Sequence, residues 1–138
     1  MKSILLATAA VLACSGAFAA TPAHEAMAGA AHGGQLRMAG ALHLELVVSK
    51  DSPKVRENPV VVYVTDHAGK PVATAGGSGK AQLKAGGVVA DLVLRPDGNN
   101  RFKGFAKYAS DPALSVSLTI VLPGQAAEQA RFQPLAAH

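Results

Sequence analysis

The histidine and methionine side chains are the most informative candidates for binding a metal ion in this sequence. They concentrate in the first half of the chain, at His24, Met27, His32, Met38, His43 and His67, and a further imidazole stands at the end, His138. Neutral imidazole suits zinc, copper and nickel, whereas a thioether suits Cu(I). We therefore ask first which of these donors the chain could bring together.

His43 and Glu45 are two residues apart in a stretch with an alternating apolar pattern. On a strand this spacing makes both side chains project from one face. Gly33-Gly34 would let the chain fold back and bring His32 to the same place. The sequence thus predicts a weak to moderate site of His32, His43 and Glu45, which suits Zn(II) or Cu(II). For Cu(I) we expect Met27, and with it His24, to be recruited instead.

The remaining donors have simpler interpretations. A histidine on the outer face of a strand is often only solvated, and this alternative stays open for His43. His67 lies in a tight turn and is expected to be solvated, and His138 is the last residue. Met38 is in phase with Leu36, which favours a place in the core over a ligand role.

The elements that must position these side chains are strands. From Gln35 onward, short apolar stretches alternate with Gly, Pro, Asn or Asp turns. The clearest alternation, which should face a core, is Leu114, Val116, Leu118, Ile120 and Leu122. Residues 60–64 are apolar on both faces and predict a central strand. About eight short strands with no amphipathic helix predict an all-β fold, an immunoglobulin-like antiparallel β-sandwich, with a small barrel as the alternative.

Tight turns and bends are expected where glycine stands between or within these strands. Gly86-Gly87 should form a tight turn, and Gly104 should mark a bulge or bend.

The first residues predict export. Lys2 precedes an apolar stretch over residues 4–13, and Ala17-Phe18-Ala19 is typical of a signal-peptidase cleavage site. We expect residues 1–19 to be a signal peptide, 20–34 an Ala/Gly-rich flexible linker, and 35–138 the β-sandwich domain. The expected location is the periplasm, with no transmembrane span. A lipoprotein anchored at Cys14, the single cysteine, is the alternative.

Composition and motifs argue against several classes of function. Without Lys2 the chain carries 12 basic and 9 acidic residues, and the basic residues are dispersed. Nucleic-acid binding needs a clustered basic face with aromatic platforms, so we expect none. Residues 76–81 (GGSGKA) imitate a phosphate loop, but Thr74 and Ala81 replace the required Gly and Ser or Thr. With no catalytic motif, we expect a protein that is not an enzyme.

Several short segments, in order, resemble a known family. They are His32-Gly33-Gly34, residues 43–47 (HLELV), 61–64 (VVYV), 69–72 (GKPV), 79–81 (GKA), 99–102 (NNRF) and 122–124 (LPG). Over residues 32–134 the chain is similar to small exported proteins found with bacterial heavy-metal efflux systems. It also resembles the N-terminal β-domain of cobalt–zinc–cadmium and copper efflux adaptors. The resemblance implies a periplasmic β-sandwich in metal homeostasis, with His32, His43 and Glu45 as the transferable metal residues.

Two functions follow as expectations. The first is a periplasmic accessory protein of heavy-metal resistance or homeostasis that binds copper or zinc. The second is a β-sandwich interaction module without metal, which docks onto an efflux pump or another envelope complex. The chain lacks the helical hairpin and lipoyl-like segments of a full adaptor, so we do not expect it to bridge a pump by itself.

Overall fold

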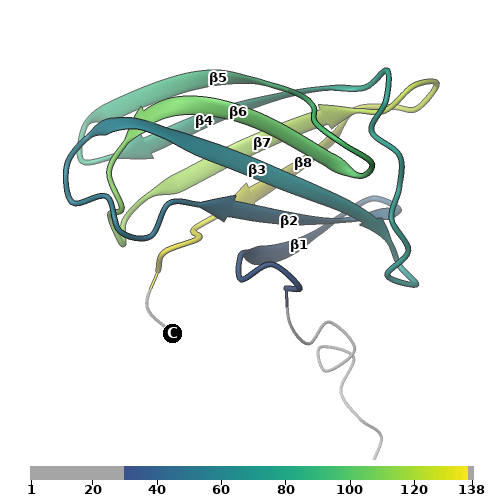
Figure 1. The fold of residues 1–138 in the computed structure, drawn as a ribbon, viewed down its shortest axis with the longest axis horizontal. Coiled ribbons are helices and arrows are strands. Elements are labelled where there is room, and N and C mark those ends of the chain that lie inside the picture. Colours follow the sequence, from purple (N-terminus) through teal and green to yellow (C-terminus); the bar gives the residue numbers. More distant parts are fainter. Residues whose placement is uncertain (1–29, 137–138) are drawn as a thin grey trace, which may run out of the picture.

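The structure is a computed structural model that describes residues 30–136, and within this range all regular secondary structure is β. Figure 1 shows the strands curving around a common interior. The strands are β1 (Gln35–Ala39), β2 (Leu42–Val48), β3 (Arg56–Asp66), β4 (Ser78–Ala85), β5 (Val88–Pro96), β6 (Arg101–Tyr108), β7 (Ser115–Val121) and β8 (Glu128–Phe132).

All neighbouring strands pair antiparallel, in the order β1-β2-β3-β6-β5-β4-β7-β8. The first four strands in this order make one layer and the last four make the other (Figure 1). The expectation of an all-β, sandwich-like fold with about eight strands is confirmed. The two layers are joined, however, because β5 and β6 stay paired at Arg95↔Lys103 and Pro96↔Phe102, beside the turn that connects them.

The two ends of this sheet, β1 and β8, are brought together by side chains. The Arg37 Nε donates to the Arg131 carbonyl at 3.3 Å, and the Gln133 amide donates to Gln35 Oε1 at 2.8 Å. The sheet therefore nearly closes on itself around its interior.

The interior is filled by the inward-facing residues of both layers. Leu44 and Leu46 of β2 are fully buried, as are Val60, Val62 and Val64 of β3. On the opposite layer the predicted alternation of β7 is confirmed, because Val116, Leu118 and Ile120 are buried. Alternate residues of β2 and β3 must then point outward, which sets the face of the sheet on which the candidate donors lie.

Two glycine positions have a clear structural reason. Gly86 and Gly87 both have positive φ, 54° and 84°, and form the two-residue turn between the paired residues Ala85 and Val88. Gly104 is buried on β6, where a Cβ would lie 2.6 Å from the Val93 carbonyl oxygen. Glycine at this position permits the close approach of β6 to β5.

Several of the sequence predictions concern residues beyond this range. The proposed signal peptide, Cys14, His24, Met27 and His138 lie outside the described residues. Within residues 30–136, no helix has the length and apolar character needed to cross a membrane.

Candidate metal site

Strand β2 places His43 and Glu45 on its outer face, as their spacing predicts. The residues between and beside them, Leu42, Leu44 and Leu46, point into the core. His43 is half-buried, whereas only 4% of Glu45 is exposed. A buried carboxylate on an outer face requires a cover and hydrogen-bond partners.

That cover is the segment before β1. The Glu45 carboxylate accepts hydrogen bonds from the His32 amide at 2.8 Å and the Gly34 amide at 2.9 Å. The His32 ring Nδ1 lies 2.9 Å from the other carboxylate oxygen, Oε1. The predicted return of His32 to Glu45 is thus present in the structure, and both carboxylate oxygens are engaged by it.

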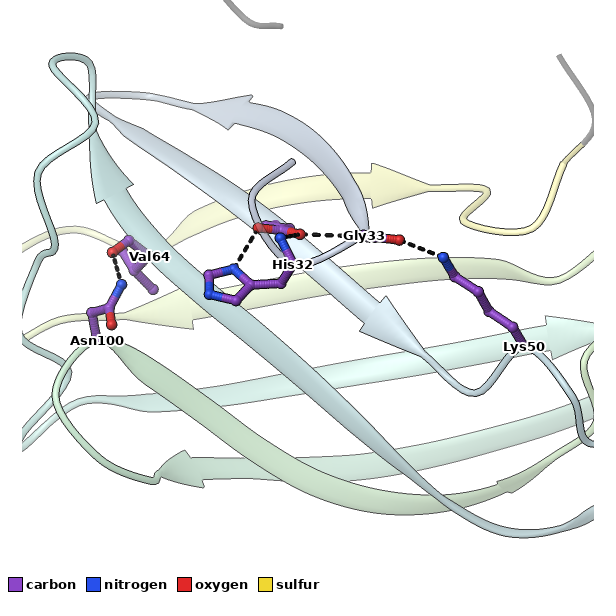
Figure 2. A network of polar contacts seen from close by, with 7 residues as sticks. His32, Gly33, Lys50, Val64 and Asn100 are labelled. Atoms are coloured by element: carbon purple, nitrogen blue, oxygen red, sulfur yellow. Dashed lines mark hydrogen bonds and ion pairs between the residues drawn. The ribbon is translucent and has the colours of Figure 1, made fainter. Parts of the chain in front are cut away.

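Glycine makes this return possible. A Cβ on Gly34 would collide with the Leu46 carbonyl oxygen, so only glycine lets the segment lie so close to β2. Lys50, which follows the end of β2, also holds this segment, because its Nζ donates a hydrogen bond to the Gly33 carbonyl at 2.6 Å (Figure 2). Residues 32–34, part of the expected flexible linker, are therefore tied to the sheet.

The His32 ring rests on an aromatic side chain of β3. It stacks on Tyr63 with ring centroids 3.5 Å apart and planes 2° from parallel. Tyr63 is paired across the strands with Arg101, whose pKa is raised by the hydrogen bond to Tyr63 and by the carboxylate of Asp97. Arg101 and Asp97 form an ion pair at 2.9 Å. His32, Glu45 and Tyr63 therefore form a compact cap on the outer face of β2 and β3, in which His32 is hydrogen-bonded to Glu45 and stacked on Tyr63.

A second histidine contact lies further along the same face. The His43 Nε2 is 3.0 Å from the His67 Nδ1, and the two rings meet edge to face with centroids 4.8 Å apart. His67 is exposed and His43 is half-buried, so the pair lies at the surface of the sheet. The turn residue His67, which the sequence predicts to be only solvated, is therefore a partner of His43.

The turn that carries His67 is ordered by Asp66, the last residue of β3. The Asp66 Oδ1 accepts hydrogen bonds from the amides of Ala68 and Lys70, each at 2.9 Å. The Lys70 amide, followed by that of Ala68, lowers the pKa of this carboxyl below its usual value. Because the ionised carboxylate organises the turn, His67 is held at the end of β3 and beside β2.

The end of β3 is fixed from its other side by Asn100. Its side-chain amide donates to the Val64 carbonyl at 3.0 Å (Figure 2), and the Val64 amide donates to the Asn100 carbonyl at 2.9 Å. The strand that leads to His67 is therefore held by hydrogen bonds on both edges, toward β2 and toward Asn100.

Met38 lies next to this histidine pair rather than in the core. It is directly opposite His43 in the register of β1 and β2, and it is 52% exposed. The predicted phase with Leu36 is correct, but the face is the outer one, because the neighbouring Ala39 points inward and is buried. The expectation that Met38 belongs to the core is wrong for this reason.

The donors expected to form one site are thus divided between two places. His32 and Glu45 form the cap, whereas His43 lies with His67 and faces Met38. Among residues 30–136, no three His, Cys, Asp or Glu side chains gather in a metal-binding arrangement. Any site at the exposed pair must therefore draw its further ligands from other donors or from water.

Of the comparisons with known proteins, the one between structures found a similar fold. No family model matches the chain, and no curated protein matches it in sequence. The structure is similar to the crystal structure of a DUF4426 family protein from Pseudomonas aeruginosa PAO1, with a TM-score of 0.53 and 19% identity. The match covers 71% of this chain and 92% of that one. At this level of identity the similarity supports the fold alone.

Proposed function

We propose that this chain is an exported, metal-binding accessory protein of heavy-metal resistance or homeostasis, and that His43 and His67 are its primary ligands. The observation that carries the proposal is the 3.0 Å separation between the His43 Nε2 and the His67 Nδ1 on an exposed face. Two imidazole nitrogens this close can turn toward one ion, and imidazole is a ligand for both zinc and copper.

The hydrogen bond between the two rings does not oppose metal binding. A neutral imidazole has one N–H and one lone pair, so one ring donates to the other in the metal-free protein. An ion of charge +2 can replace this bridge once the donor ring carries its proton on its other nitrogen, so that both rings stay neutral and each offers a lone pair to the ion. Solvent then fills the remaining coordination positions, which favours weak to moderate affinity.

Glu45 has a different role in this proposal from the one its spacing predicts. Its carboxylate is buried and accepts hydrogen bonds from two backbone amides and the His32 ring, so recruitment as a ligand would leave amides unpaired. We assign it to holding the segment before β1. The His32 Nδ1 then stays with the Glu45 carboxylate, and within residues 30–136 no group of three metal-binding side chains includes this ring.

The first test is a calorimetric titration of the exported protein with Zn(II), Cu(II) and Ni(II). We expect His43→Ala and His67→Ala each to weaken Zn(II) and Cu(II) binding by at least about tenfold, because each removes half of the imidazole pair. His32→Ala is the matched control and should bind as the wild type does. Lowering the pH should weaken binding, because protons compete with the metal ion for the imidazole nitrogens. Wild-type affinity in both pair variants would disprove the assignment.

Export is proposed from the first 19 residues, and it has its own measurement. We expect mass spectrometry of the protein from the periplasmic fraction to give a chain that begins at Ala20, without Cys14. A lipid-modified chain that begins at Cys14 would replace the free periplasmic form with an anchored one.

The second candidate function, an interaction module without metal, is favoured by one surface. Val89 and Val93 of β5 and Phe105 of β6 are each more than half exposed, and the Lys103 Nζ lies 5.3 Å from the centre of the Phe105 ring. Lys107 lines the same shallow hollow as Val89 and Phe105. Glu57 and Asp91 line the hollow as well, so this apolar patch with charges of both signs at its rim suits an envelope partner that presents apolar side chains flanked by charged ones. If the wild-type protein binds none of the three metals, this function becomes the better explanation.

A further inference from the structure

We propose that Met38 is a third ligand beside His43 and His67, and that the combined site of two imidazoles and one thioether takes Cu(I). The inference rests on the proposed function, because it uses the same histidine pair. It goes further by naming the oxidation state of the metal and a ligand on a third chain segment.

The register of the strands places Met38 correctly for this role. Met38 of β1 is the direct partner of His43 of β2, and directly paired residues of antiparallel strands have Cβ atoms about 4.5–5.5 Å apart. Both side chains are on the outer face, because Ala39 and Leu42 beside them point into the core. A thioether at the end of a flexible, unbranched side chain can cover that distance.

The exposure of Met38 shows that its side chain is not committed to packing. It is 52% exposed on the edge strand β1. His43 of β2 is its direct cross-strand partner, and Thr65 of β3 is in turn the partner of His43. A large apolar side chain in this position gains little from burial. Its sulfur is therefore free to bind an ion held by the neighbouring imidazoles.

The chemistry of the three donors selects among metals. Thioether ligands are soft and favour Cu(I), which accepts low coordination numbers and also binds imidazole. Zinc is bound in proteins by thiolate, imidazole and carboxylate, and thioether is not among its usual ligands. Met38 should therefore contribute to the affinity for Cu(I) and contribute little to the affinity for Zn(II).

The competing arrangement is the one expected from the sequence, in which Met27 and His24 bind Cu(I) in the segment before the sheet. This arrangement predicts that Met27→Leu weakens Cu(I) binding and that Met38→Leu does not, whereas a site at Met38 predicts the reverse. Leucine preserves volume and apolar character at either position and removes only the sulfur. The two variants are therefore matched controls for each other.

The experiment is an anaerobic competition titration of the protein that begins at Ala20, which contains no cysteine, against a chromogenic Cu(I) chelator. We expect Met38→Leu to weaken Cu(I) binding by at least about tenfold, as a lost soft ligand should. Met27→Leu should bind Cu(I) as the wild type does. In parallel, Zn(II) affinity of Met38→Leu should stay within about threefold of the wild type.

Failure of this inference is separable from failure of the proposed function. Loss of Cu(I) binding in Met27→Leu but not in Met38→Leu would overturn the inference in favour of the segment before the sheet. Equal Cu(I) binding in all three proteins, or none in the wild type, would also overturn it, while Zn(II) binding that depends on His43 and His67 would leave the proposed function intact. Loss of both metals in Met38→Leu would mean that the residue is needed for the fold and is not a selective ligand.

Discussion

Replacement of Leu118 by alanine should lower the free energy of unfolding by about 2–5 kcal/mol, the cost of a buried leucine truncated in a packed core. Leu118 is 1% exposed and lies in the middle of β7, between its cross-strand partners Ala81 of β4 and Ala130 of β8. Both partners are small, so neither can fill the cavity that the truncation leaves. Urea unfolding followed by circular dichroism measures the change.

Ser117→Ala is the matched control on the same strand. Ser117 is exposed on the opposite face of β7, so its replacement should change the free energy of unfolding by no more than about 0.5 kcal/mol. Comparable losses in the two variants would mean that the inward and outward faces of β7 are assigned in reverse.

Replacement of Glu45 by alanine should release the segment before β1 while the sheet stays folded. The change removes the acceptor of the His32 and Gly34 amides and of the His32 ring. Hydrogen bonds to a charged group contribute about 1.5–3 kcal/mol, so the Gly34 amide should exchange roughly tenfold to a hundredfold faster with deuterium. Amide exchange followed by nuclear magnetic resonance gives this rate residue by residue.

Two further variants make the result specific. Glu45→Gln keeps an oxygen acceptor without the charge, so its exchange rate should lie between those of wild type and Glu45→Ala. Glu57→Ala removes an exposed carboxylate from β3 and should leave the Gly34 amide unchanged. An unchanged Gly34 rate in Glu45→Ala would show that the carboxylate does not hold the segment.

The parts of this structure that could be predicted from sequence are those governed by local periodicity. Alternation correctly assigns Leu44 and Leu46 to the core and, by the same rule, His43 and Glu45 to the outer face. The return of the chain at Gly33-Gly34 is likewise a local property, because it needs only residues without a Cβ where the segment lies close to β2. These predictions depend on neighbours within a few residues, which a single sequence displays directly.

The composition of the site could not be predicted, because it depends on register between strands. His43 meets His67 only because β2 and β3 pair with His43 opposite Thr65, and a loop of several residues between the strands does not determine this alignment. Met38 could not be placed for a similar reason. It lies on an edge strand, where the alternation of apolar residues does not reveal which face of the strand is buried. A clue was present in the Asp66-His67-Ala68-Gly69 turn, where an aspartate that orders a turn also orders its histidine.

The contact between β1 and β8 affects how readily another protein chain could add a strand to this edge of the sheet. An unpaired strand edge can template the addition of a foreign strand, which is a route to fibrils. Here the Arg131 carbonyl is occupied by the Arg37 guanidinium, and the Gln133 amide by the Gln35 side chain. A chain arriving at this seam must first displace these partners, so we expect this edge to be a poor template for the addition of a foreign strand.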